Sequence, residues 1–162
     1  MSQPKPEGRW PDICGHLVED AAGRRHVLPL RVYFEDTDFS GLVYHGSYVR
    51  WCERGRSDFL RLIGNDHRAL LAGADGREPA AFVVRRMALD FLRPARIDEI
   101  LEVTTRVAAS TAATLTLDQR ISRGQMLLFT AEVMVVLMSA AGKPLRLSAR
   151  LRDALRAKNP PA

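Results

Sequence analysis

The stretch RVYFEDTDFSGLVYHGSYVRWCERGRSDFLRL, residues 31–62, contains the features that decide the fold. Its start continues a run rich in Val, Leu, Tyr and Phe, which predicts a β-strand over residues 26–35. A loop follows over residues 36–46. Beyond it, apolar residues recur at steps of three and four, the spacing of one face of an α-helix. They are Tyr48, Trp51, Cys52, Gly55, Phe59, Leu62 and Ile63.

The residues around this helix set its limits. Ser47 is suited to be the N-cap, and Gly64 stands where a C-terminal cap is expected. Gly55 lies on the apolar stripe, where glycine destabilises a helix, so we expect a sheet to approach it closely. On the polar face, Arg54 and Asp58 are spaced to form an i,i+4 ion pair.

The rest of the chain is predicted to be mostly β. Residues 66–71 form a short second helix, and Ser148 caps a closing helix that ends near residue 155. A short strand and turn precede the first strand, over residues 16–23. Four strands at hairpin spacing occupy residues 81–92, 100–109, 113–122 and 126–138.

The strand at residues 126–138 is apolar on both faces, which predicts a central strand covered on both sides. A second subunit could supply this cover, and so could the closing helix with the tails. The order of elements predicts an α+β fold with one antiparallel sheet around the long helix. We expect an N-terminal extension, partly flexible, at residues 1–24, a single domain at 25–157 and a flexible tail at 158–162.

Composition narrows the class of protein. The net charge is +5 and nearly all of the positive charge is arginine, which suits a phosphorylated ligand. The charges are dispersed and no nucleic-acid-binding motif is present, so we expect no nucleic-acid partner. No apolar segment is long enough to span a bilayer, and no signal core is evident. Cys14 and Cys52 lack disulfide or metal spacing, and the histidines lack metal spacing, so we expect a cytoplasmic protein without a metal.

The run EDTDFSGLVYHGSY, residues 35–48, followed by ERGRSDFL, resembles the 4-hydroxybenzoyl-CoA thioesterase superfamily. Within that superfamily it is most similar to the Tol–Pal-associated acyl-CoA thioesterases of Gram-negative bacteria. The stretch DFLRPARIDEILEV, residues 90–103, resembles the same family. The resemblance implies a hot-dog fold, with about five antiparallel strands around one central helix. It also implies homodimers or homotetramers with active sites between subunits.

The resemblance assigns the catalytic carboxylate to Asp38. This carboxylate would attack the thioester carbonyl directly or activate a water molecule. The alternative is a structural aspartate that closes an Asx-turn. Negative charge from Glu35 and Asp36 would raise the pKa of Asp38, unless both side chains point into solvent. The family carries a tyrosine where this chain has Phe34, so any hydroxyl contribution from that position is lost, and Tyr33 should point to the opposite strand face.

The start of the long helix is the expected oxyanion site, because its N–H groups are unpaired and its dipole is positive there. We assign this role to the backbone at or next to His45, including Gly46. The His45 side chain could polarise the carbonyl or shuttle a proton, or it could simply pack on Tyr44. Tyr48 is expected to line the acyl pocket or to belong to the core.

The implied substrate is a short- or medium-chain or aromatic acyl-CoA, hydrolysed to the free acid and CoA without a cofactor. Its phosphates would be bound by arginines, with Arg85 and Arg93 as the chosen candidates among a set that also holds Arg86, Arg96 and Arg120. Acyl carrier protein is a second possible partner. Two other functions stay open at this level: a hot-dog hydratase or dehydratase, and a catalytically weak protein that binds acyl carrier protein.

Overall fold

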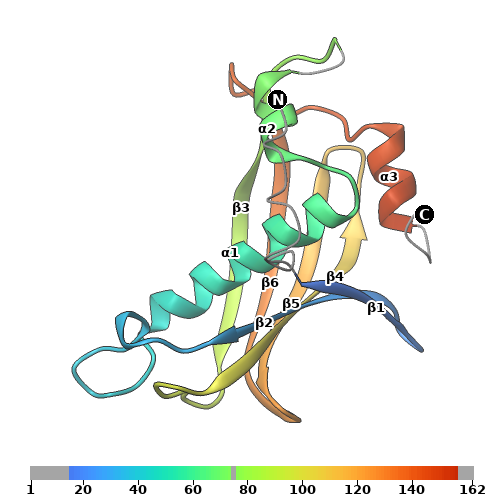
Figure 1. The fold of residues 1–162 in the computed structure, drawn as a ribbon. Helices are drawn as coiled ribbons and strands as arrows, with labels where there is room; N and C mark the ends of the chain where they lie inside the picture. The colour runs from blue at the N-terminus through green and yellow to red at the C-terminus, as the bar shows by residue number, and fades with distance from the viewer. Residues whose placement is uncertain (1–14, 74–75, 157–162) are drawn as a thin grey trace, which may run out of the picture.

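A six-stranded antiparallel sheet curves around one long helix in the computed structural model, which describes residues 15–73 and 76–156 (Figure 1). The strand order across the sheet is β1-β2-β4-β5-β6-β3. In chain order the elements are β1 (His16–Asp20), β2 (Gly23–Arg31), a 3-10 helix (Phe34–Asp36), α1 (His45–Leu62), α2 (His67–Ala72), β3 (Ala80–Phe91), β4 (Ile100–Ser110), β5 (Thr114–Arg123), β6 (Met126–Ser139) and α3 (Ala149–Arg156). The α+β hot-dog architecture is thereby confirmed. The sheet has six strands where about five were expected, because β1 pairs with β2 along its whole length.

The core lies between α1 and the concave face of the sheet. Side chains alternate between the two faces of each strand, and alternating residues of β4, β5 and β6, such as Val103, Leu117 and Val133, are buried in this core. The helix contributes its apolar stripe, on which Trp51, Cys52 and Phe59 are almost completely enclosed. The predicted stripe is therefore the packing face. Burial raises the pKa of the Cys52 thiol to about 12.

Gly55 is the point of closest approach between α1 and the sheet. A Cβ atom at this position would lie 3.0 Å from Val103 Cγ1 and 3.1 Å from Thr105 Oγ1. Next to it, buried Arg56 donates to Gln119 Oε1 at 2.9 Å, and the Gln119 amide donates to Thr105 Oγ1 at 2.9 Å. The expected approach of a sheet to Gly55 is confirmed, and a polar network that we had not predicted lies beside it.

The first strand ends earlier than predicted. β2 stops at Arg31, and the chain then turns into the 3-10 helix Phe34–Asp36. The turn forms because Asp36 is buried and its Oδ2 accepts the N–H of Tyr33 at 2.9 Å. Strand alternation therefore no longer applies, and Tyr33 and Phe34 are both exposed instead of pointing to opposite faces.

The start of α1 also differs from the prediction. The helix begins at His45 with Tyr44 as its N-cap, so Ser47 lies inside the first turn instead of capping it. The other end is as expected, since Gly64 follows the helix with φ of +88°. The predicted ion pair between Arg54 and Asp58 is not formed. Asp58 is bonded instead to Arg61 at 2.6 Å and to His26 at 2.7 Å.

The central position of β6 is confirmed, because it lies between β5 and β3. On its convex side Val136 is buried and Met134 and Met138 are half-buried. The closing helix is confirmed as well: the backbone N–H of Leu151 donates to Ser148 Oγ at 3.1 Å. The free edges of the sheet are β1 and β3.

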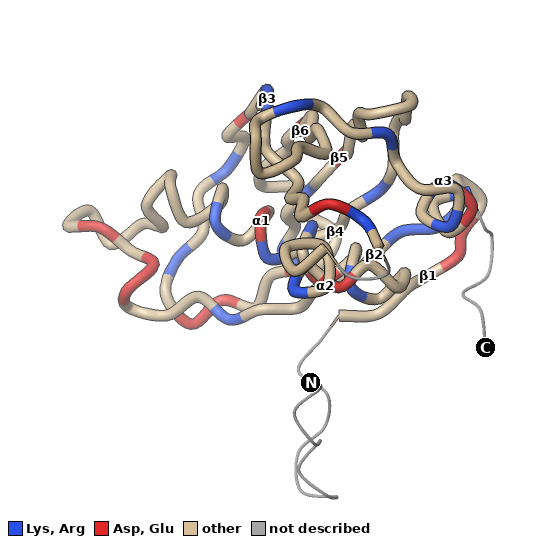
Figure 2. Tube along the Cα trace, turned by 90° about the horizontal axis from the view of Figure 1, so that it is seen from above, with Lys and Arg blue, Asp and Glu red and all other residues tan. Residues whose placement is uncertain are grey.

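The ends of the chain bear on the predicted domain limits. β1 joins residues 16–20 to the sheet, so the folded unit reaches upstream of residue 25. The predictions for residues 1–14 and 157–162 lie outside the described residues. Within the described part, Figure 2 shows basic and acidic positions interspersed along the trace. No helix in that part is long and apolar enough to cross a membrane.

Candidate active site

The loop that carries Asp38 is closed at its base by hydrogen bonds to the carbonyl of Asp36. This oxygen accepts the N–H of Tyr44 at 2.8 Å and the hydroxyl of Ser47 at 3.1 Å. On the other side, the N–H of Val43 donates to the carbonyl of Ala95 at 2.9 Å. These bonds fasten the loop to the first turn of α1 and to the segment that follows β3.

Asp38 is exposed on this loop. Its Oδ1 accepts the backbone N–H of Ser40 at 2.8 Å and the Ser40 hydroxyl at 2.5 Å. The Asx-turn geometry is therefore present. Oδ2 has no hydrogen-bond partner among the described residues, so one carboxylate oxygen is available for chemistry.

The charge state of Asp38 is set by its local bonds. The hydroxyl and backbone N–H of Ser40, and then the charge of nearby His45, hold the pKa of Asp38 below its ordinary value. The expectation that Glu35 and Asp36 raise this pKa is wrong. Asp36 is turned inward to Tyr33, and Glu35 is exposed to solvent.

The first turn of α1 presents free backbone donors. Within the described chain, the N–H groups of His45 and Gly46 donate to no acceptor, as expected at a helix start. A Cβ atom at Gly46 would lie 2.6 Å from the ring of Tyr44, so a larger residue there would displace this exposed side chain. The His45 ring packs against Tyr44 with centroids 4.3 Å apart and meets Phe91 edge-on at 6.4 Å.

A depression of about 290 Å³ opens beside this turn, lined by Leu42, Val43, His45, Tyr48, Phe91, Leu92, Arg93 and Pro94. Asp38 is not part of this lining, but its N–H donates to the carbonyl of the lining residue Leu42 at 3.0 Å. Tyr48 lies between this depression and the core. It lines the depression, and it is also a buried residue that stacks on Phe129 at 5.3 Å.

The two candidate arginines are separated by the structure. Arg93 borders the depression and donates to the carbonyl of Leu127 at 3.0 Å. Arg85 lies in the bulge of β3 between Val84 and Arg86, and it is not part of the lining. Arg85 precedes Phe91, a residue of the lining, by six positions along the strand, which corresponds to about 20 Å. Arg85 is therefore not brought to the site within this chain.

A helix-borne acid paired with a histidine, which the sequence did not reveal, is present away from the depression. His26 Nε2 and Asp58 Oδ2 lie 2.7 Å apart, and the N–H of Gly15 donates to the same oxygen at 2.7 Å. The His26 side chain is completely buried, and its Nδ1 has no hydrogen-bond partner among the described residues. The pair is outside the lining of the depression, and its hydrogen bonds link β2 and the residue before β1 to α1.

Three residues of the site were missed from the sequence. Ser40 controls the charge of Asp38, and Ser47 fastens the loop. Ala95 is the third: its carbonyl binds the loop, and its N–H donates to the hydroxyl of Tyr48 at 3.0 Å. Only the position of Ser40 two residues after Asp38 was a usable signal, because the other contacts join segments far apart in sequence.

Comparison with known proteins identifies the family. The model of the thioesterase superfamily matches residues 40–130, which are 91 of the 162 residues. The chain therefore belongs to the thioesterase superfamily and is an enzyme of the thioester-hydrolase class. The matched region begins two residues after Asp38 and includes His45, Gly46 and Tyr48.

Relatives with known names agree with this family. The acyl-CoA thioester hydrolase YbgC of Escherichia coli is 44% identical over 109 residues, which cover 67% of this chain and 78% of the relative. The acyl-CoA thioesterase YbgC of Haemophilus influenzae is 38% identical over 108 residues, covering 67% and 76%. The crystal structure of a probable thioesterase from Bartonella henselae superposes with a TM-score of 0.74 at 44% identity, covering 76% of this chain and 99% of that one.

More distant structures share the fold. A 1,4-dihydroxy-2-naphthoyl-CoA thioesterase from Synechocystis superposes with a TM-score of 0.73 at 21% identity. It covers 82% of this chain and 96% of its own. At this identity the likeness concerns the architecture alone.

Proposed function

We propose that the protein is an acyl-CoA thioesterase in which Asp38 is the catalytic carboxylate. The observation that carries the proposal is that two groups lie at the start of α1: the carboxylate of Asp38, whose Oδ2 is free among the described residues and which is under the influence of the charge of His45, and the N–H groups of His45 and Gly46, which are unpaired there. A thioester carbonyl between them would meet a nucleophile on one side and an oxyanion site on the other. The names of the YbgC relatives support acyl-CoA as the substrate class.

The bonds from Ser40 favour a nucleophilic role for Asp38 over a general-base role. They lower the pKa of the carboxyl group, so Asp38 is ionised at neutral pH but is a weak base. A general base works best when its pKa lies near the operating pH. Direct attack on the thioester carbonyl would break the C–S bond and expel CoA as a thiolate, which takes a proton from solvent, and it would leave a mixed anhydride on Asp38 that water hydrolyses to the free acid and the regenerated carboxylate. Hydroxylamine added during turnover can attack either carbonyl of this anhydride, and a hydroxamate found on Asp38 would identify the anhydride, because a general-base mechanism never activates the Asp38 carboxyl group.

Substrate binding would use the side chains around the depression. Tyr48, Phe91 and Leu92 offer an apolar surface to the acyl group, and Arg93 offers a guanidinium to the phosphates of CoA. Arg85 can contribute only from the neighbouring subunit of an oligomer, because it is remote from the depression in its own chain.

A homodimer would complete this site. β3 is an edge strand of twelve residues, and Val83, Val84, Phe91 and Leu92 are exposed on it or just beyond its end. An unpaired edge with apolar side chains is suited to pairing with a second copy. We expect a dimer or a tetramer in solution, measurable by light scattering on a size-exclusion column. A location in the cytoplasm and a role beside the Tol–Pal system stay predictions.

The test is thiol release from a panel of acyl-CoA thioesters of different chain lengths, including an aromatic one. Asp38→Asn should lower kcat by at least about a thousandfold without changing the melting temperature. Asp98→Asn is the matched control: Asp98 is also an exposed loop aspartate, and its φ of +66° suits asparagine. Equal activity of the two variants would end the proposed mechanism.

The same panel separates the alternatives. Acyl-acyl carrier protein hydrolysed faster than acyl-CoA would identify the carrier protein as the natural partner. Hydration of an enoyl-CoA without thiol release would point to the hydratase class. Binding of acyl carrier protein without any hydrolysis would reduce the role to docking.

A further inference from the structure

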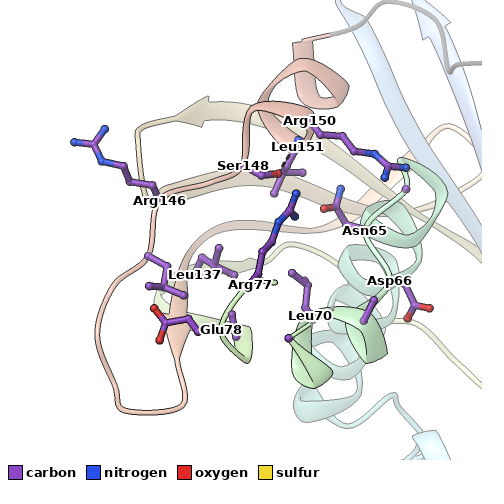
Figure 3. A pocket seen from close by; sticks show the side chains of 15 residues that line it. Asn65, Asp66, Leu70, Arg77, Glu78, Leu137, Arg146, Ser148, Arg150 and Leu151 are labelled. Carbon is purple, nitrogen blue, oxygen red and sulfur yellow. Dashed lines mark hydrogen bonds between the residues drawn. The ribbon is translucent and has the colours of Figure 1, made fainter. Parts of the chain in front are cut away.

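A second cavity lies at the opposite end of α1 from Asp38. It measures about 370 Å³ and is formed where the end of α1 meets α2, α3 and the adjoining ends of β3 and β6 (Figure 3). The eighteen residues of α1 separate the two ends by roughly 27 Å. The cavity is therefore distinct from the site at the first turn of the helix.

The floor of this cavity is apolar. Ala80, Leu137 and Leu151 belong to the buried core, and Leu145 packs against it. Leu70 of α2 adds a half-buried side chain on the facing side. A volume of this size, bounded by leucines, is suited to a small organic ligand and not to a simple ion.

Three arginines belong to the lining of the cavity. Figure 3 shows Arg77 extending across the opening toward Asn65 and Ser148, Arg150 reaching over the end of α1, and Arg146 pointing away. Within the described residues, none of these three arginines forms an ion pair or a side-chain hydrogen bond. Arg150 is near the carboxyl end of α1, where the helix dipole favours a cation. Arg77 has no charged partner among the described residues, and it is the arginine that extends across the opening.

Two neutral polar side chains, Asn65 and Ser148, line the same cavity as Arg77. The side-chain amide of Asn65 makes no hydrogen bond within the described chain. The Ser148 oxygen accepts the N–H of Leu151 at 3.1 Å, and this leaves its own hydroxyl hydrogen free to donate. A guanidinium fork, an amide and a hydroxyl together suit the two oxygens of a carboxylate.

The orientation of the charged side chains bears on the charge of the ligand. Arg77 extends across the opening, whereas Arg146 points away from it and the carboxylate of Asp66 accepts the N–H of Arg68 at 2.8 Å. A single guanidinium across the opening matches the single charge and the two oxygens of a carboxylate. We propose that the cavity is a second binding site, which takes an amphipathic monoanion such as a short alkyl or aryl carboxylate. This inference concerns binding alone and does not rest on thioester hydrolysis.

The experiment is a titration of the full chain, labelled with 15N-glycine, with sodium octanoate. Gly64 and Gly73 line the cavity, whereas Gly41 and Gly46 belong to the Asp38 loop and the first turn of α1. Saturable shifts of the Gly64 and Gly73 signals are expected. Shifts confined to Gly41 and Gly46 would place octanoate at the other end of the helix and overturn the proposal.

Variants and analogues test the chemistry. Arg77→Gln should raise the Kd measured at Gly64 and Gly73 about tenfold, while Arg68→Gln, an exposed arginine outside the lining, should leave it unchanged. Acetate has the carboxylate but lacks the alkyl chain, and 1-octanol has the chain but lacks the charge. Each analogue should therefore bind at least tenfold more weakly than octanoate. Equal binding of either analogue, or an unchanged Kd in Arg77→Gln with a native glycine spectrum, would refute the site.

Discussion

Replacement of Tyr48 by phenylalanine tests how the loop and the segment after β3 are held to α1. The hydroxyl of Tyr48 accepts the N–H of Ala95 at 3.0 Å, and Ala95 is completely buried. Tyr48→Phe keeps the ring and its stacking on Phe129, but it leaves the N–H of Ala95 without an acceptor. A buried donor without a partner costs about 1–3 kcal/mol of folding free energy.

The effect on the melting temperature follows from the size of the chain. For a protein of 162 residues, a loss of 1 kcal/mol lowers Tm by roughly 2–4 °C, so a loss of about 2 kcal/mol corresponds to roughly 4–8 °C. Urea unfolding should show the same loss as a lower midpoint with an unchanged m-value.

Tyr44→Phe is the matched control. Tyr44 is adjacent in the site but exposed, and its hydroxyl makes no hydrogen bond within the described residues. Its replacement should change stability by less than about 0.5 kcal/mol. If the two variants melt at the same temperature, the bond between Tyr48 and Ala95 does not stabilise the fold and the reasoning fails.

Three further outcomes are expected. Gly55→Val should lower the free energy of unfolding by about 1–3 kcal/mol, because the sheet leaves no room for a larger side chain. A variant with the same urea midpoint as the wild type would contradict the close packing of α1 on the sheet. Ser47→Ala removes the bond to the carbonyl of Asp36, and should cost about 1 kcal/mol and lower kcat several-fold while KM changes little; an unchanged kcat would exclude a positioning role. Burial lowers the pKa of His26 below its usual 6.5, and the hydrogen bond and charge of Asp58 oppose this effect. Because His26 binds a proton more readily in the unfolded chain than in the folded one, the free energy of unfolding should fall as the pH drops below about 6.5. His26→Gln should flatten this dependence in urea titrations at pH 7.5 and 5.5, and an equally steep fall in the variant would assign it to other groups.

The sequence was sufficient for the architecture because local patterns and packing agree. The steps of three and four between Tyr48 and Phe59 identify the buried face of α1, and the period-two pattern of β5 identifies its inner face. Gly55 was informative because glycine in a helix needs a compensating contact. The first residue of α1 could not be predicted from the sequence. Ser47 does not cap the helix, because its hydroxyl donates to the carbonyl of Asp36, a contact that forms only when the loop has folded back onto the helix.

The sequence pointed to the loop and helix start of the candidate site, but not to the residues that hold them together or to the electrostatics of the site. A count of nearby acids suggested a raised pKa for Asp38, whereas the direction is set by which atoms point at the carboxylate. Asp36 turns inward and Ser40 turns toward Asp38, and neither orientation follows from spacing alone. The cavity around Arg77 was not predictable either, because its lining comes from five separate segments of the chain.

The enclosed thiol of Cys52 can report on the mobility of the helix. Its side chain has no exposed surface, and with a pKa of about 12 almost none of it is thiolate at neutral pH. An alkylating reagent can reach this sulfur only when α1 lifts from the sheet. The labelling rate of the peptide that contains Cys52, followed by mass spectrometry, would therefore give the free energy of that opening under native conditions.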